Sequence, residues 1–295
     1  MTTSPLASPS ATRELLERYG LATKHRLGQN FLVDGHVVER IMALAALEGS
    51  ERVVEVGPGI GTLTLALVQE AAAVLAIEAD AALEPVLESH AARHDNLRYL
   101  MGDALRVPAA RMVEELGGAP EMLIANLPYN VAATVILQYF EELPSLRAAV
   151  VMVQKEVADR IAAAPGTKAY GAYTVKLSLR GRVTGRFEVP PRCFLPAPHV
   201  DSAVVRIDRV AVEPAAVAGP ALAAEAAPAP EELARVAQVV DAAFAQRRKT
   251  IRNSMAANGF DKAALDVAFA AAGIESTARA ETLSTEDFIR LAAAL

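Results

Sequence analysis

Three glycines and an acid stand together in one short segment of the sequence, Glu55-Val-Gly57-Pro-Gly59-Ile-Gly61. An apolar run typical of a strand precedes the segment, and a helical pattern begins at Thr62. Glycine lets the backbone turn sharply and approach a ligand closely, and the start of a helix offers free N–H donors. The segment therefore predicts a loop that binds a small cofactor.

Two classes of cofactor could bind to a loop of this kind. A dinucleotide-binding loop has the spacing G-x-G-x-x-G and holds a pyrophosphate at the start of the helix. Here the spacing is G-x-G-x-G, and Glu55 stands just before the glycines. A carboxylate at that place would repel phosphates but suits a cationic amino-acid group. The spacing favours S-adenosylmethionine, a methyl donor that carries such a group, over NAD.

Two further acids follow the next two predicted strands. Glu78, which is 21 positions past Gly57, ends one strand and could bind both hydroxyls of a ribose, whether in NAD or in S-adenosylmethionine. Asp103 follows the next strand, where it could accept a hydrogen bond from an adenine amine. Either acid alone could be a helix cap. Because ligands of such sheets bind at the carboxyl ends of the strands, the loop and both acids predict one cofactor site.

The tetrapeptide Asn126-Leu127-Pro128-Tyr129 follows a fourth strand. An adenine amine is a poor nucleophile because its lone pair is delocalised into the ring. The Asn126 side-chain oxygen and the Leu127 carbonyl could accept its hydrogens and offset positive charge as a methyl group arrives. Pro128 would stiffen the loop, and Tyr129 offers a ring on which a base can stack. Such a tetrapeptide is otherwise an ordinary turn; in this place it predicts methyl transfer to adenine.

The elements that must position these residues alternate along the chain as strands and helices. Apolar, β-branched runs predict buried strands of a parallel sheet, and amphipathic stretches predict helices that cover it, an α/β fold. The predicted strands are Arg52–Val56, Ala73–Glu78, Leu97–Met101, Met122–Ala125, Ala148–Val153 and Ser202–Ile207, and the helices between them include Thr62–Gln69, Ala82–Ala91 and Ala133–Phe140.

Four regions divide the chain. Residues 1–24 predict a polar, partly helical arm, and residues 25–209 predict the α/β domain. Residues 210–230 are rich in alanine and proline, which predicts a linker or insert. Residues 231–295 predict a small all-helical domain, with Leu233, Val236, Val239 and Val240 at helical spacing.

Bulk composition narrows the class of protein. The 295 residues are 53% hydrophobic and 22% charged, which is ordinary for a globular protein. No apolar run is long enough to span a membrane, and no basic-then-apolar signal opens the chain. The one cysteine, Cys193, cannot form an intramolecular disulfide, so a cytoplasmic location is expected. The few histidines are scattered without ligand spacing, so we expect no metal.

One basic cluster stands out against a net charge of -6. Arg247, Arg248, Lys249 and Arg252 stand within six residues near the C-terminus. Net charge is a blunt guide, because binding to nucleic acid depends on where the cations lie. The cluster is either a solvated helix face or an RNA-binding surface.

Taken together, these segments resemble the KsgA (RsmA) family of dimethyladenosine transferases that act on small-subunit ribosomal RNA. The resemblance runs from about Lys24 to the C-terminus and is interrupted by the insert. Its segments are Gly28-Gln-Asn30-Phe-Leu32, Glu55-Val-Gly57-Pro-Gly59, Asn126-Leu-Pro-Tyr129-Asn130, Gln154-Lys-Glu156, Lys168-Ala-Tyr170-Gly171, Phe194-Leu-Pro196-Ala-Pro198-His199-Val-Asp201-Ser202-Ala203 and Gln246-Arg-Arg-Lys-Thr-Ile-Arg-Asn253-Ser254.

The resemblance implies a Rossmann-like, S-adenosylmethionine-dependent methyltransferase sheet followed by a helical RNA-binding domain. Asn30 and Leu32 would line the methionine end of the cofactor, and Phe194 would sandwich the target adenine against Tyr129. The remaining cofactor site would comprise Gly57, Gly59, Glu78, Asp103 and Asn126. The implied activity transfers four methyl groups, two to N6 of each of two adjacent adenosines near the 3′ end of 16S rRNA. The implied substrate is an assembling 30S subunit, and we expect the enzyme to act as a monomer.

Some features depart from the family pattern. His199 stands where the family usually has lysine, and Leu27 where it often has phenylalanine. The change at His199 is expected to weaken one backbone or RNA contact without touching the chemistry. The N-terminal arm and the alanine-rich insert have no counterpart that assigns them a role.

Two alternatives belong to other classes. One is a methyltransferase of large-subunit ribosomal RNA, which confers antibiotic resistance. Asp201-Ser202-Ala203 and the segment from Gln246 to Asn253 speak against it, because that branch differs at both places. The other is a non-catalytic assembly or transcription factor that binds nucleic acid on the same fold. The intact glycine loop and the intact Asn126–Tyr129 segment argue for an enzyme.

Overall fold

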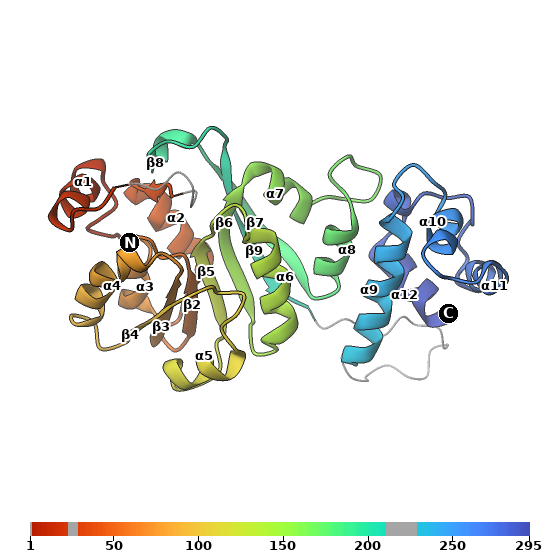
Figure 1. Ribbon diagram of the computed structural model, residues 1–295, viewed down its shortest axis with the longest axis horizontal. Coiled ribbons are helices and arrows are strands. Elements are labelled where there is room, and N and C mark those ends of the chain that lie inside the picture. Colours follow the sequence, from red (N-terminus) through yellow and green to blue (C-terminus); the bar gives the residue numbers. More distant parts are fainter. Residues whose placement is uncertain (1, 23–28, 211–228) are drawn as a thin grey trace. The chain divides into compact units, whose positions relative to one another are not determined.

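The computed structural model describes residues 2–22, 29–210 and 229–295. The chain forms two compact units (Figure 1). The first unit comprises Met1–Ala158 and Val183–Arg209, and the second comprises Asp159–Arg182 and Val210–Leu295. Leu27 and most of the predicted 210–230 linker lie outside the described residues.

A seven-stranded sheet with the order β4-β3-β2-β5-β6-β9-β7 forms the centre of the first unit. Strands β2 to β6 pair in parallel, as the buried apolar runs predict. The order of the strands reverses between β2 and β5, which makes the carboxyl ends of these two strands the topological switch point where ligands bind. The strands are β2 (Arg52–Val56), β3 (Ala73–Glu78), β4 (Leu97–Met101), β5 (Met122–Asn126), β6 (Ala148–Gln154), β7 (Gly181–Val189) and β9 (Ser202–Arg209).

The prediction of a purely parallel sheet is wrong for the strand that follows β6 in the sheet order. Strand β9 runs antiparallel to β6, with Ala148 opposite Asp208 and Gln154 opposite Ser202. Its apolar residues are as buried as those of a parallel strand, so the composition of β9 did not reveal its direction. Strand β7 was not predicted. It lies at the sheet edge, and its exposed positions carry Arg182, Thr184, Arg186 and Glu188, so it contains no continuous apolar run.

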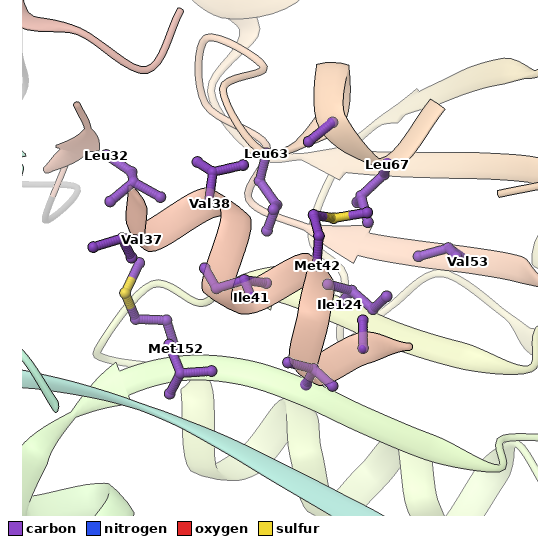
Figure 2. Close-up of a cluster of buried hydrophobic side chains, with 14 of the residues drawn as sticks. Leu32, Val37, Val38, Ile41, Met42, Val53, Leu63, Leu67, Ile124 and Met152 are labelled. Atoms are coloured by element: carbon purple, nitrogen blue, oxygen red, sulfur yellow. The ribbon is translucent and has the colours of Figure 1, made fainter. Parts of the chain in front are cut away.

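Helices bury both faces of the sheet. Figure 2 shows Val37, Val38, Ile41 and Met42 of α2 over Val53 of β2, Ile124 of β5 and Met152 of β6, with Leu63 and Leu67 beside them. The strand residues that point to the other face, such as Val54, Leu75 and Val151, are fully buried as well. The helices here are α1 (Pro9–Arg18), α2 (Gly35–Ala45), α3 (Thr64–Glu70), α4 (Glu84–Ala91), α5 (Ala109–Leu116), α6 (Ala132–Glu142) and α7 (Lys155–Ile161), and the short 3₁₀-helix η2 (Ala81–Leu83) precedes α4.

The second unit is helical. Tyr170, Val175 and Leu179 share its buried core with side chains of the C-terminal helices, and the Tyr170 hydroxyl donates to the Leu283 carbonyl at 2.7 Å. The structure therefore groups residues 159–182 with the C-terminal helices, whereas the sequence had placed them in the 25–209 domain. The helices are α8 (Ala172–Ser178), α9 (Pro230–Phe244), α10 (Ile251–Ala257), α11 (Lys262–Ala272) and α12 (Thr285–Ala294), with the 3₁₀-helix η4 (Ala280–Thr282) before α12.

Candidate active site

A cleft of about 210 Å³ opens at the carboxyl ends of β2, β3 and β5 in the first unit. The predicted catalytic and cofactor-binding residues meet there, with the exception of Phe194. The predicted residues that line it are Asn30, Leu32, Gly57, Gly59, Glu78, Asp103, Asn126, Leu127 and Tyr129. Glu55, Thr62 and Asp80 also contribute to its walls.

The glycine loop packs directly against the loop that follows β5. Gly57 has a φ of +70°, in the left-handed region that favours glycine. A Cβ atom at Gly57 would lie only 3.0 Å from the Cδ atom of Pro128, so a side chain there would press on Pro128 as well as strain the backbone. The two motifs recognised in the sequence are thus one structure. Helix α3 begins at Thr64, two residues after the predicted start at Thr62.

Glu55 is buried within the cleft wall, with 1% of its surface exposed. The Thr64 hydroxyl donates to its Oε2 atom at 2.6 Å. Burial raises the pKa of Glu55 to about 8, with a further contribution from the nearby Glu78 and a partly opposing one from Thr64. The free protein therefore holds Glu55 mainly as a neutral carboxyl near pH 7, whereas the sequence suggested a carboxylate. A bound cation would favour the ionised form.

Glu78 links the end of β3 to the glycine loop. Its Oε2 atom accepts the Gly59 N–H at 3.1 Å, and its Oε1 atom accepts the Asp80 N–H at 2.9 Å. Burial raises the pKa of Glu78, and these N–H groups oppose the shift. A carboxylate oxygen has more than one lone pair, so these contacts leave capacity to accept from a ribose hydroxyl.

Gln29 and Asp80 form a contact in the cleft wall that sequence reasoning missed. The Gln29 Nε2 atom donates to the Asp80 Oδ2 atom at 2.7 Å across 51 residues of chain. Asp80 follows Glu78 by two positions, so an acid just past a strand end was the available signal. Its pairing with Gln29 had no signal in the sequence.

Asp103 lies on the cleft with its side chain half exposed. Its Oδ1 atom accepts the Leu105 N–H at 3.0 Å, and Arg106 lies 3.4 Å from its Oδ2 atom. These contacts shape the turn after β4. The adenine-binding role of Asp103 stays a prediction.

All four residues of the Asn126–Tyr129 segment line the cleft. The Leu127 N–H donates to the Met152 carbonyl at 3.0 Å, which anchors the loop to β6. Within the described residues, neither the Asn126 side chain nor the Leu127 carbonyl has a hydrogen-bond partner. In a structure where most buried polar groups are paired, such acceptors are available to a ligand.

Tyr129 is held by a residue of β9, which lies two strands away from β5 in the sheet. Its hydroxyl lies 2.7 Å from the Oγ atom of Ser202, which is fully buried at the start of β9. Burial raises the pKa of Tyr129, and the bond to Ser202 partly opposes the shift. The bond fixes the direction of the ring. Because 73 positions separate the two residues, no local pattern in the sequence indicates the pairing.

Phe194 lies close to the site but is not among the residues that line the cleft. It forms the strand β8 (Phe194–Leu195), which pairs antiparallel with β1 (Phe31–Leu32), so that Phe194 stands opposite Leu32. Its side chain is 4% exposed and belongs to the same buried core as Leu32. Its predicted stacking role stays a prediction. The neighbouring Cys193 is buried, and burial together with Asp34 raises the pKa of its thiol to about 11.

The basic cluster follows α9 in the second unit. Arg247, Arg248 and Lys249 are exposed, and Arg247 donates to the Lys168 carbonyl at 2.9 Å. Arg252 differs from them, because two hydrogen bonds of 2.5 and 2.6 Å join it to Asp266 of α11. Three of the four predicted RNA-binding cations are thus presented to solvent, and the fourth is held by an acid. His199 is also exposed.

No group of three or more histidine, cysteine or acidic side chains in the described residues could hold a metal ion. None of the helices in the described part of the chain has the length and hydropathy needed to cross a bilayer.

The family model described as ribosomal RNA adenine dimethylase matches residues 20–295. A ribosomal RNA small subunit methyltransferase A from Nocardia farcinica is 43% identical over 300 residues, covering 98% of this chain and 95% of the relative.

Two solved structures are similar over most of the chain. The 23S rRNA methyltransferase ErmE is 26% identical with a TM-score of 0.64, covering 90% of this chain and 99% of its own. A dimethyladenosine transferase from Plasmodium falciparum is 22% identical with a TM-score of 0.69, covering 88% and 94%. The latter likeness concerns the fold, which matches the Rossmann-like methyltransferase sheet described above.

Proposed function

The chain belongs to the ribosomal RNA adenine dimethylase family, and on that premise we propose that it methylates N6 of two adjacent adenosines near the 3′ end of 16S rRNA. It is an S-adenosylmethionine-dependent methyltransferase. The product would be a pair of N6,N6-dimethyladenosines, formed while the 30S subunit assembles. The observation that carries the proposal is that Asn126 and Leu127 line the same cleft as the glycine loop, and that the Asn126 side chain and the Leu127 carbonyl have no hydrogen-bond partner in the described part of the chain.

The cleft residues fit S-adenosylmethionine, which supplies an electrophilic methyl group on a sulfonium. Gly57 and Gly59 of the glycine loop both line the cleft, and Pro128 packs closely on Gly57. Two buried acids, Glu55 and Glu78, can receive a cation and ribose hydroxyls. The buried Thr62 hydroxyl has no partner among the described residues, which is unusual for a polar group in a protein interior. In this proposal Asn30 and Leu32 line the methionine end, and Asp103 meets the adenine of the donor.

The chemistry falls to the Asn126 side-chain oxygen and the Leu127 carbonyl. They accept the two hydrogens of the adenine amine and so draw its lone pair out of the ring. As the methyl group arrives, these acceptors offset the positive charge that develops on nitrogen, an effect strongest in the transition state. No general base is needed, because the proton becomes acidic once the nitrogen is methylated. Tyr129, held by Ser202, supports the base by stacking.

Dimethylation places a demand on the same two acceptors. After one transfer the amine has a single hydrogen, and its methyl group must occupy the place of the other. The methylated amine can rotate to keep that hydrogen toward Asn126. The Asn126 oxygen therefore serves both steps, while the space near Leu127 accommodates the first methyl group.

The small-subunit substrate is supported by the degree of similarity. Identity is 43% with the small-subunit enzyme of Nocardia farcinica and 26% with the 23S rRNA methyltransferase ErmE. A transfer assay with labelled S-adenosylmethionine on unmethylated 30S particles, 50S particles and naked 16S rRNA tests this choice. We expect label in the 30S particles, at two adjacent adenosines. Label in the 50S particles would favour the large-subunit alternative, and no label would favour the non-catalytic one.

The second unit would grip the RNA backbone through Arg247, Arg248 and Lys249, which are exposed. Changing all three to alanine should weaken binding to 30S particles and flatten its salt dependence, by roughly 0.7–0.9 in slope for each lost phosphate contact. Arg252→Ala is a matched comparison and should have a smaller effect, because Asp266 already neutralises that cation. An unchanged salt slope in the triple variant would make the cluster a solvated helix face.

The proposal includes the oligomeric state and the location of the enzyme. A monomer would suit a substrate as large as an assembling subunit. A location in the cytoplasm would suit a chain whose one cysteine is a buried thiol. Sedimentation of the purified chain with and without 30S particles tests the oligomeric state. A stable dimer in both conditions would contradict it.

A further inference from the structure

The N-terminal arm packs into the first unit as helix α1. Ser8 caps the helix by accepting the Ala11 N–H at 3.2 Å, and Pro9 opens it, a residue favoured at that position. The buried Thr12 hydroxyl donates to the Leu6 carbonyl at 3.1 Å, which folds the preceding segment back onto the helix. Most of this arm precedes residue 20, where the match to the family model begins.

Three leucines of the arm enter a buried cluster that includes parts of the cleft. Leu6, Leu15 and Leu16 are at most 9% exposed. Phe31 and Leu83, which share their cluster, line the cleft, and Ile60 of the same cluster belongs to the glycine loop itself. Leu65 of α3 and Val86 of α4 complete the cluster. The arm is thus one side of a core whose other side is the wall of the donor site.

Phe31 connects this cluster to the glycine loop by direct contact. A Cβ atom at Gly59 would lie 3.1 Å from the Cε1 atom of Phe31, so the ring rests against the backbone of the loop. Gly59 has a φ of +60° and donates its N–H to Glu78. A shift of the Phe31 ring would therefore change both the course of the loop and the position of the Glu78 carboxyl.

We propose that α1 is a positioning element of the donor site, in which Leu15 and Leu16 hold Phe31 against the glycine loop and pack on Ile60 of the loop itself. Donor binding and the docking of α1 are then coupled. Coupling between two sites is reciprocal, so whatever loosens α1 weakens donor binding, and the bound donor stabilises α1 to the same extent. The inference rests on the proposed donor site, and its tests are chosen to separate the two.

Hydrogen exchange on the unaltered protein is the first test. Saturating S-adenosylmethionine should slow the exchange of the α1 amides, although none of the residues of α1 lines the cleft. The amides of α11 in the second unit serve as the internal reference and should not respond. Unchanged exchange in α1, together with protection of the glycine loop, would overturn the proposal.

A matched pair of variants is the second test. Leu16→Ala removes an arm side chain that is 9% exposed, and Leu116→Ala removes one of 6% exposure at the end of α5, which does not line the cleft. We expect Leu16→Ala to raise the Kd for S-adenosylmethionine by about 5- to 50-fold, within the range of typical couplings, and Leu116→Ala to leave it within about twofold. With saturating donor, kcat should be kept in both variants, so that the defect of Leu16→Ala appears in KM for the donor.

The outcomes distinguish this inference from the proposed function. If the unaltered protein does not bind S-adenosylmethionine in calorimetry, the donor site itself is wrong. If it binds, but Leu16→Ala and Leu116→Ala have the same Kd and α1 shows no protection, only the positioning role of α1 fails.

Discussion

Glu51 and Glu55 stand at opposite ends of β2, and both are buried, with 3% and 1% of their surfaces exposed. Their surroundings differ. The Glu51 carboxylate accepts N–H groups from Glu48, Gly49 and Ser50 at 3.0–3.2 Å, and Arg147 lies 3.3 Å away. Glu55 accepts one hydroxyl from Thr64.

The two carboxyls respond to burial in opposite ways. Burial alone would raise the pKa of Glu51, but the backbone N–H groups and Arg147 outweigh it and lower the pKa below its ordinary value. Burial raises the pKa of Glu55 to about 8, because one hydroxyl does not replace the lost water. At the amino edge Glu51 is paired within the protein, whereas at the carboxyl edge Glu55 accepts a single hydroxyl and the Asn126 side chain has no partner among the described residues. Substitutions at the first edge should therefore cost stability, and those at the second should cost activity.

Asn126→Ala should show the largest effect at the carboxyl edge. Loss of one transition-state acceptor costs about 100- to 1,000-fold in rate, and we expect mono- and dimethyl product to fall together. Stability should hardly change, because the Asn126 side chain has no partner among the described residues. Mass spectrometry of digested RNA measures both products.

Tyr129→Ala is the matched control for that variant. It should mainly weaken capture of the base, since stacking contributes about 1–3 kcal/mol per base. Dimethylation at a near-normal rate by the Asn126→Ala enzyme would overturn the mechanism.

Glu78→Ala should weaken donor binding. The side chain is buried and accepts charge-assisted hydrogen bonds, so its loss should cost about 1.5–3 kcal/mol, or roughly 10- to 150-fold in Kd. Calorimetry with S-adenosylmethionine measures the change, and Glu78→Gln, which keeps an acceptor, should lose less. Equal donor affinity in all three proteins would remove Glu78 from the cofactor site.

Glu51→Ala should have the opposite signature at the amino edge. The substitution leaves the N–H groups of Glu48, Gly49 and Ser50 without their acceptor, at a cost of about 1–3 kcal/mol in the free energy of unfolding. Denaturant titration measures that loss, and the Kd for S-adenosylmethionine should not move. A Glu51→Ala protein with weaker donor affinity and unchanged stability would contradict the proposed difference between the amino and carboxyl edges of the sheet.

Below the raised pKa of Glu55, the affinity of the protein for a cationic donor should change by about tenfold per pH unit, because the donor must displace a proton from this carboxyl. Between pH 4.5 and about 8 the folded protein holds a proton on Glu55 that the unfolded chain has released, so the stability of the free protein falls as pH rises through this window. A cationic donor prefers the ionised form, so its affinity should rise from pH 7 to pH 8 and then level off.

Glu55→Gln is the control for this dependence, because it cannot ionise and should flatten both profiles. Calorimetry in two buffers with different ionisation enthalpies should detect a proton released on donor binding near pH 7. An affinity for S-adenosylmethionine that is constant from pH 6 to pH 8 in the unaltered protein would contradict the role of Glu55.

Much of this site follows from local sequence. Strands β2, β3 and β4 match their predicted bounds, because a short apolar run that ends at a glycine or an acid has few alternatives. Once those strands are parallel, their carboxyl ends share one edge, so Gly57, Glu78, Asp103 and Asn126 had to meet. Periodicity and strand direction were enough to predict which of these side chains lie at one edge of the sheet, without knowledge of the packing.

Tertiary structure alone decided the partners and the burial of those residues. The bond between Tyr129 and Ser202, the contact between Gln29 and Asp80 and the docking of α1 each join segments far apart in the chain. The antiparallel direction of β9 and the place of residues 159–182 depend on which core receives their apolar side chains. The protonation of Glu55 depends on how completely water is excluded from it. Local sequence carries the pattern of polarity, but desolvation and partnership arise only when distant segments pack, because both are properties of the surroundings of a residue.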